Sequence, residues 1–250
     1  MNKKWVYPVS SLIILLVIWE VLVKVLAIPL YILPAPSKIF LSLYTNRAIL
    51  FQHSLTTLAE AVIGLILSAI LAFTISLLMD RFETLKLTTY PHLVISQTIP
   101  ILVLGPIFSI WFGFGLTPKV LIVLLMCFFP IAIAFTDALK NVNHKKINLL
   151  KTYGANSWQI YRLVKIPEAL PAFFSGLRVS ATYCIGGAIV GEWLSASSGL
   201  GYYMIRAKNG YLLDKVFATV LVIIGLSLLL NWCITLLQKI LLKKRMISHG

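Results

Sequence analysis

The side chains that could do chemistry are few in this 250-residue chain, and they are scattered. Four histidines stand far apart at positions 53, 92, 144 and 249, and neither H-E-x-x-H nor G-x-S-x-G occurs. The three cysteines each fall inside an apolar run, without the spacing of a metal site or of a disulfide framework. Catalysis would need paired titratable groups, a metal set or an activated nucleophile. The sequence therefore predicts neither an enzyme nor a metal site, and we expect the cysteines to be buried as small apolar residues.

A polar segment, KTYGANSWQIYRLVKIP at residues 151–167, stands out because the sequence around it is mostly apolar. The longer loop that contains this segment reads as two short helices, Ile147–Tyr153 and Trp158–Val164. Gly154 can take the left-handed conformation that ends a helix, and Asn156 or Ser157 can cap the next one. Pro167 is expected to stop that second helix.

The composition explains what surrounds this segment. Hydrophobic residues make up 59% of the chain and charged residues only 12%, against about 45–50% and 25% in soluble domains. A single water-soluble core of this length could not bury so much apolar surface. The lipid bilayer is the solvent that fits.

Six stretches are long and apolar enough to cross a membrane, given the need for about 20 mostly apolar residues. We place them at about 5–27, 58–79, 91–112, 120–137, 172–191 and 216–238. The first could instead be a signal peptide, but its length and Glu20 favour a retained span. The sequence thus predicts an all-α, polytopic membrane protein in a single permease-like domain.

The basic residues indicate the orientation. Most of the 22 Lys and Arg residues fall on the side that holds both termini and the 138–171 loop. Because basic residues accumulate in cytoplasmic loops, we expect both termini and this loop to be cytoplasmic. The net charge of +14 then follows from topology, and no nucleic-acid partner is needed.

The 138–171 loop carries large apolar groups at the membrane surface, and two interpretations are open. It could lie on lipid headgroups or pack under the bundle, or it could insert into a groove of a cytoplasmic partner. The candidate docking residues are Asn148, Leu149, Leu150, Tyr153, Gly154, Ala155, Trp158, Tyr161 and Pro167.

Two membrane segments contain candidate residues for a transport path. Pro91, Pro100 and Pro106 interrupt the third span, and the backbone groups that proline frees survive only inside protein or beside a cavity. The polar candidates just before Pro100 are Ser96, Gln97 and Thr98, and structural hydrogen bonding between helices is the alternative interpretation. Small residues form a stripe on the fifth span, which either packs inside one bundle or lines a subunit interface. The candidates there are Gly176, Ser180, Gly187, Gly191 and the adjacent Glu192.

The loop also resembles a known signature. Gly154 is followed by nine residues and then by Val164-Lys165-Ile166-Pro167, which is similar to the Glu-Ala-Ala-x3-Gly-x9-Ile-x-Leu-Pro motif of bacterial ABC-importer permeases. The chain departs from that motif at its start, where Asn148, Leu149 and Leu150 replace Glu-Ala-Ala. In the family this loop seats in a cleft of the ATPase subunit.

Further motifs extend the resemblance over about residues 33–201 and point to the nitrate, sulfonate and taurine permeases. They include LPAPS at 33–37, QTIP at 97–100, WFGFG at 111–115, GEW at 191–193 and SGLG at 198–201. SQTIPILVLGPIFSIWFGFG and GAIVGEWL most resemble permeases for the thiamine pyrimidine precursor, hydroxymethylpyrimidine or its formylamino relative. The resemblance implies a type I importer fold, a homodimer in the bacterial inner membrane, separate ATPase subunits and an external binding protein. It implies no cofactor in this chain.

Two observations bear on rival mechanisms. The chain has no G-x-x-x-x-G-K-[ST] motif, so it is not expected to bind ATP itself. A secondary, ion-coupled transporter would usually show two related halves and membrane acids facing a path. No repeat is visible, and Glu20, Glu60, Asp137 and Glu192 can all be placed near the ends of spans. We therefore expect an ATP-driven importer of a small solute, either a neutral or weakly charged heterocycle or, as the next choice, a sulfonate-type anion.

Overall fold

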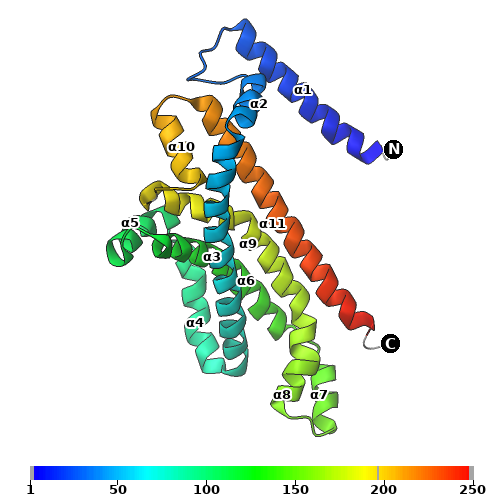
Figure 1. Cartoon of the computed structure of the whole chain (residues 1–250). Helices are drawn as coiled ribbons and strands as arrows, with labels where there is room; N and C mark the ends of the chain where they lie inside the picture. Colours follow the sequence, from blue (N-terminus) through cyan, green and yellow to red (C-terminus); the bar gives the residue numbers. More distant parts are fainter. Residues whose placement is uncertain (1–2, 196, 248–250) are drawn as a thin grey trace.

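The computed structural model describes residues 3–195 and 197–247, with side chains over 6–194 and 197–242. Over these ranges the chain is built of helices (Figure 1). They are α1 (Lys3–Val25), α2 (Pro36–Thr45), α3 (Arg47–Arg81), α4 (Glu83–Ser96), α5 (Ile101–Phe112), α6 (Leu116–Lys140), α7 (His144–Thr152), α8 (Ser157–Ile160), the π-helical segment η1 (Tyr161–Lys165), α9 (Ile166–Ser195), α10 (Leu200–Asn209) and α11 (Leu213–Ile247). The all-α prediction is confirmed. His249 and the basic side chains at 3, 4 and 243–245 lie outside the described part.

Helices α3, α6 and α9 form the centre of the molecule, and α11 packs along α9 (Figure 1). Their shared apolar core includes Val123, Ile131, Phe174 and Ile185. Gly64 lets α3 approach α6 closely, because a β-carbon at this position would collide with the side chain of Val123. Small residues at helix contacts are the usual means of packing inside a bilayer.

Hydroxyl groups fix α3 against α6 along their length. Ser68 Oγ donates to the carbonyl of Leu124 at 2.9 Å, and Ser76 Oγ donates to that of Ala132 at 3.1 Å. Thr136 Oγ1 donates to Ser76 Oγ at 2.9 Å. Interhelical hydrogen bonds of this kind hold membrane helices in register. The two helices therefore form one frame for the segments attached to them.

Five helical segments are long and apolar enough to cross a membrane: Val6–Val25, Arg47–Arg81, Leu116–Lys140, Ser157–Leu194 and Leu213–Leu242. A sixth is obtained if the bent pair Glu83–Ser96 and Ile101–Phe112 counts as one span. The predicted spans fall within these segments, apart from the ends of the first, and several structural helices are longer. In particular, α3 begins at Arg47 rather than near position 58.

The predicted third span at 91–112 is interrupted, as its prolines indicate, and falls on the two helices α4 and α5. The chain bends by 103° between α4 and α5. Pro100 stands at the start of α5 with an extended ψ of 117°. Because proline disfavours the helical conformation of the residue before it and lacks an N–H, the helix ends there. Pro91 and Pro106, by contrast, lie inside α4 and α5.

The prediction that Pro167 stops a helix is wrong. Helix α8 continues through η1 into α9, with Pro167 as the second residue of α9. The π-helical turn at Tyr161–Lys165 changes the hydrogen-bond spacing immediately before the proline. The helix therefore passes the proline without a break.

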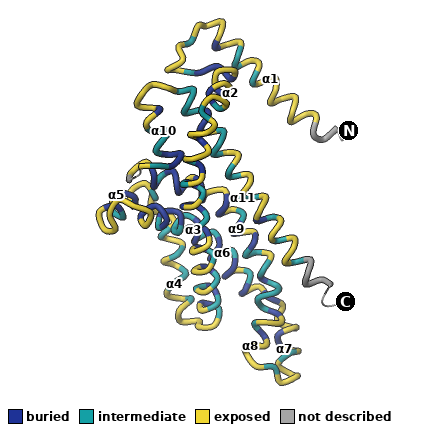
Figure 2. The backbone as a smooth tube through the Cα atoms, in the orientation of Figure 1, coloured by how far each residue is buried: buried dark blue, intermediate teal, exposed yellow. Residues whose placement is uncertain are grey.

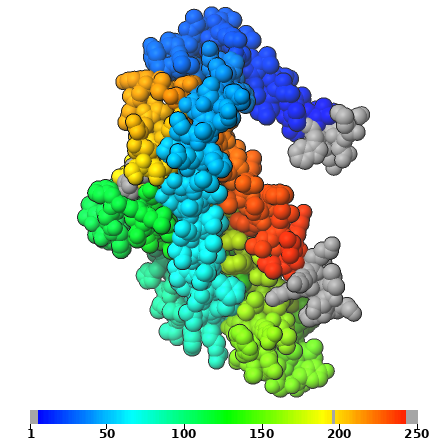
Figure 3. Space-filling model, in the orientation of Figure 1, coloured from blue at the N-terminus to red at the C-terminus, as the bar shows by residue number. Residues whose placement is uncertain are grey.

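Helix α1 diverges from the bundle, and the α7–α8 hairpin projects from the opposite end (Figure 3). The contacts of α1 lie near its C-terminal end, where Trp19 packs edge-on against Phe217 of α11 at 5.8 Å. Glu20 accepts hydrogen bonds from the backbone and hydroxyl of Ser37. Most of the remaining α1 surface is exposed and apolar (Figure 2), which is the surface that a lipid-facing helix presents.

Candidate functional site

The predicted loop is a helical hairpin with its own small core. Val142, Ile147, Ile160 and Val164 form this core. Both helix starts are capped. Asn156, one of the two predicted caps, forms a reciprocal capping box with Gln159, and Asn143, which was not predicted, accepts from the N–H of Lys145. The hairpin is thus a preformed element.

Gly154 makes the turn between the two helices. Its φ is +75°, and nothing lies within 4 Å of the position that a β-carbon would occupy. The predicted helix-ending role is confirmed. A side chain would have enough space at this position. Glycine is favoured here because the left-handed backbone conformation is costly for most other residues.

The hairpin exposes large side chains near its turn, although Trp158 also borders a pocket beside α3. Tyr153 is 79% exposed and Trp158 is 67% exposed, and Leu149 and Asn148 are also exposed. Figure 2 shows the tip as an exposed end of the molecule. The name docking tip is used below for Asn148, Leu149, Tyr153 and Trp158.

The other predicted docking residues face the protein. Leu150 and Ala155 pack partly against the hairpin core, and Pro167 is half-buried in α9. Tyr161 is half-buried and donates a hydrogen bond to Asp80 at the C-terminal end of α3. The structure therefore separates an exposed tip from a base that joins the hairpin to the bundle.

The three polar residues predicted for the path line a cavity of about 560 Å³ at the bend between α4 and α5. Ser96 and Thr98 direct their hydroxyls to backbone carbonyls of their own helix end, at 2.7 Å each. Gln97 lies between them and is exposed. The rest of the lining is apolar or aromatic and includes Met126, Phe129 and Tyr183. The lining contains no formally charged side chain.

The small-residue stripe on α9 faces α6 of the same chain. A β-carbon at Gly176 would lie 2.8 Å from the backbone of both Pro130 and Ile131, and one at Gly187 would lie 3.3 Å from Val123 Cα. Ser180 Oγ donates to the Cys127 carbonyl at 2.7 Å. Of the two interpretations, packing inside one bundle describes these residues.

Gly191 and Glu192 continue the stripe toward α10. A β-carbon at Gly191 would lie 2.9 Å from Lys119 Cα. Glu192 is buried, accepts the Thr57 hydroxyl at 2.6 Å and accepts the backbone N–H of Gly201 at 2.5 Å. We call this contact between α9, α3 and the start of α10 the Glu192 network.

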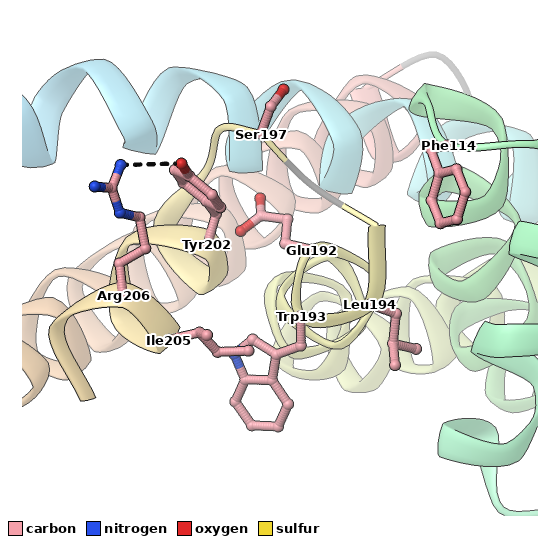
Figure 4. Close-up of a pocket in the computed structure, with 8 residues that line it drawn as sticks. All are labelled: Phe114, Glu192, Trp193, Leu194, Ser197, Tyr202, Ile205 and Arg206. Carbon is pink, nitrogen blue, oxygen red and sulfur yellow. Dashed lines mark hydrogen bonds between the residues drawn. The ribbon is translucent and has the colours of Figure 1, made fainter. Parts of the chain in front are cut away.

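Two further bonds complete the Glu192 network. The N–H of Leu200 donates to Thr57 Oγ1 at 2.8 Å, and the N–H of Gly199 donates to His53 Nδ1 at 3.0 Å. Beside it lies a cavity of about 530 Å³ between α9, α10 and the α5–α6 connection. In Figure 4, Glu192 and Trp193 enter it from α9, and Tyr202 and Arg206 from α10.

A buried ion pair lies on α3 and α6. Lys119 Nζ contacts Glu60 Oε1 at 2.7 Å, with side chains only 7% and 2% exposed. Sequence reasoning placed Glu60 near the end of a span and gave it no partner. A carboxylate one turn inside an apolar run is a signal of a buried partner, but the partner itself could not be read from the sequence.

Sequence reasoning also missed Asp80, Thr57 and Lys119. Each is a single polar residue in or beside an apolar helix, and its partner lies 59 to 135 residues away in the chain. Among the described residues, no three His, Cys, Asp or Glu side chains form a group that could hold a metal ion.

The chain is similar in sequence to a known family and to known transport proteins. Residues 64–246 match the family described as binding-protein-dependent transport system inner membrane component. The chain is 38% identical over 239 residues to the formylaminopyrimidine transport permease protein ThiX of Halalkalibacterium halodurans, covering 95% of each chain. It is 35% identical to a probable ABC transporter permease protein of Haemophilus influenzae, over 94% of this chain and 96% of the relative.

The solved structures support the fold. The chain superposes with a TM-score of 0.65 and 19% identity on a chain of the MetNI methionine ABC transporter in an inward-facing conformation, covering 77% of this chain and 96% of that one. The predicted type I importer permease fold is confirmed. By its sequence and its fold, the chain belongs to the inner membrane components of binding-protein-dependent transport systems and is the permease component of an ABC importer.

Proposed function

We propose that this permease imports a small neutral heterocycle of the pyrimidine type, driven by ATPase subunits that dock on the cytoplasmic hairpin. An external binding protein delivers the solute. The permease works as a homodimer, with both termini in the cytoplasm. This chain holds no cofactor, and ATP is bound by the partner.

The docking tip supports the ATPase partner. Its aromatic side chains are exposed at the end of a hairpin that is otherwise capped, packed and joined to the bundle. A helix lying on lipid headgroups would need no such preformed turn. Exposed aromatic residues on a rigid element are the usual anchors of a protein interface.

The uncharged cavity at the α4–α5 bend supports a neutral solute. Ser96, Gln97 and Thr98 offer hydroxyl and amide groups, and Phe129 and Tyr183 offer ring faces. A sulfonate would call for a cationic partner, as anions in buried sites do. The similarity to ThiX agrees with this choice. A sulfonate-type anion is the second candidate, favoured by 29% identity to a putative aliphatic sulfonates permease, SsuC of Bacillus subtilis.

Co-purification tests the docking proposal. The double variant Tyr153→Ala with Trp158→Ala should leave the permease in the membrane but lose its ATPase subunit and substrate-stimulated ATP hydrolysis. Loss of buried interface aromatics typically costs about 2 kcal/mol or more each. Phe82→Ala is the matched control, because Phe82 is an exposed aromatic residue at the inner end of α3 and outside the hairpin. Retention of the ATPase by the double variant would contradict the proposal.

Reconstituted vesicles test the energy source and the substrate. Import should require ATP on the ATPase side and should persist when the proton gradient is collapsed, whereas a secondary transporter would show the reverse. Hydroxymethylpyrimidine or its formylamino relative should compete for import at concentrations where taurine does not. Competition by taurine alone would favour the anion.

A further inference from the structure

The inner end of α3 is joined to the π-helical segment η1 by a half-buried polar contact. Asp80 Oδ2 accepts the hydroxyl of Tyr161 at 2.5 Å and the ammonium of Lys165 at 2.6 Å. The Lys165 ammonium also lies 5.0 Å from the centre of the Tyr161 ring. We call these three residues the Asp80 latch.

The latch joins the end of α3 to the segment that connects the hairpin to α9. Asp80 is the penultimate residue of α3, a single helix that runs from Arg47 to Arg81. Tyr161 and Lys165 are the first and last residues of η1, which connects the hairpin to α9. In a π-helical turn, residues four apart lie nearly above one another, so both side chains reach the same carboxylate. Single π-turns inside helices occur frequently at functional sites.

The latch is too well shielded to be an ordinary surface ion pair. The side chain of Asp80 is 9% exposed and that of Lys165 is 19% exposed. A carboxylate at this depth depends on its charged and hydroxyl donors, and charge-assisted hydrogen bonds of this type are the strong ones. Asparagine at position 80 would keep the shape but lose the charge.

The other end of α3 carries the Glu192 network. Thr57, on the same helix, binds Glu192 of α9 and the N–H of Leu200 at the start of α10. Hydroxyl bonds to α6 at Ser68 and Ser76 fix the helix between these two contacts. A displacement of η1 is therefore applied to a helix that is bonded to its neighbours at intervals between Thr57 and Asp80.

We propose that Asp80 is a positioning residue that couples the hairpin to the transport path. The Asp80 latch makes the hairpin and α3 move together when a docked ATPase shifts the docking tip. Without the latch, the hairpin pivots at η1, and ATP hydrolysis no longer moves the bundle. This inference rests on the proposed docking of an ATPase, but it concerns transmission rather than binding.

The measurement is the number of ATP molecules hydrolysed per solute imported, in vesicles that contain the permease, its ATPase and its binding protein. Asp80→Asn, Tyr161→Phe and Lys165→Met each remove one element of the latch. We expect the ratio to rise by about tenfold in Asp80→Asn, within the range of typical coupling between sites, with normal ATPase co-purification. Combining Asp80→Asn with Lys165→Met should add little, because both remove the same contact.

The chain provides a matched control. Tyr90 on α4 donates its hydroxyl to Asp137 on α6 at 3.1 Å in an exposed contact. Tyr90→Phe and Asp137→Asn remove the same chemical groups as the latch variants, at a place that does not touch the hairpin. Both should keep the wild-type ratio.

Three outcomes would overturn the inference. One is an unchanged ratio in Asp80→Asn. A second is a loss of protein and of bound ATPase in proportion to import, which a merely structural role predicts. The third is an equal rise in the control variants. Failure of the docking proposal gives a different result. The double variant Tyr153→Ala with Trp158→Ala would then retain its ATPase, whether or not the Asp80 latch is intact.

Discussion

Lys119 and Glu60 form an ion pair at 2.7 Å between α6 and α3, in a region where both side chains are almost wholly buried. The second carboxylate oxygen of Glu60 has no hydrogen-bond partner among the described residues. Either charge alone would be costly to bury here, so removal of one residue of the pair should destabilise the protein measurably.

We expect Lys119→Met to destabilise the permease by about 3–5 kcal/mol, because it leaves a buried carboxylate without its cation. Adding Glu60→Met should restore most of this loss, since two apolar side chains of similar volume can replace a buried pair. Thermal unfolding in detergent measures both. A double variant that is less stable than the single one would show that the pair is not the cause.

The glycines of α9 provide a second test. Gly176→Ala forces a β-carbon against the backbone of Pro130 and Ile131 and should cost about 1–3 kcal/mol of stability. Gly186→Ala, on the open side of the same helix, has nothing within 4 Å and should be neutral or stabilising by up to about 1 kcal/mol. Equal effects in detergent unfolding would contradict the close packing of α9 on α6.

Gly154 separates backbone conformation from packing. Gly154→Val should distort the hairpin turn and lower ATPase co-purification, because a β-branched residue strongly resists a φ of +75°. Gly154→Asn should be tolerated, because asparagine enters the left-handed region at small cost. If valine and asparagine behave alike, the turn is not what orients the docking tip.

Topology can be measured by thiol labelling in a background with Cys233→Ala, because Cys233 is exposed while Cys127 and Cys184 are buried. A cysteine at Asn209 should react with an impermeant reagent in intact cells. A cysteine at Asn143 should react only after the cytoplasmic face is opened. Labelling of position 143 in intact cells would reverse the orientation.

Gln97 tests the cavity at the α4–α5 bend. Gln97→Ala removes an amide that no other described side chain in the lining replaces, so we expect import at low solute concentration to fall about five- to tenfold, the effect of losing one or two neutral hydrogen bonds. Gln52→Ala, on the exposed N-terminal part of α3, is the control. Unchanged import by Gln97→Ala would remove this residue from the path.

Much of the fold could be predicted because hydropathy and capping are local properties. The apolar runs, the cap at Asn156 and the left-handed Gly154 each depend only on residues that are close together in the sequence. The errors concern proline, which can either end a helix or lie inside one. Before Pro100 the chain leaves α4 through turn bonds to the carbonyls of Ile95 and Ser96, and α5 starts after the proline. Pro167 instead follows a π-turn and lies inside α9.

The site was only partly predictable for a different reason. Asp80 and Lys165 are 85 residues apart, and Thr57 and Glu192 are 135 apart. No spacing rule connects such pairs. The candidates on the hairpin surface could be predicted from the sequence, because their exposure follows from the hairpin itself. The residues that join the hairpin to α3 could be identified only from the positions of the packed helices.

The uncharged lining of the cavity at the α4–α5 bend has an electrical consequence. Moving one elementary charge across a membrane at 100 mV is worth about 2.3 kcal/mol. Moving a neutral solute through this cavity involves no electrical work in either direction. Import by this permease should then proceed at the same rate in polarised and depolarised vesicles, and the accumulation of solute should be limited by the phosphorylation potential of the cell alone.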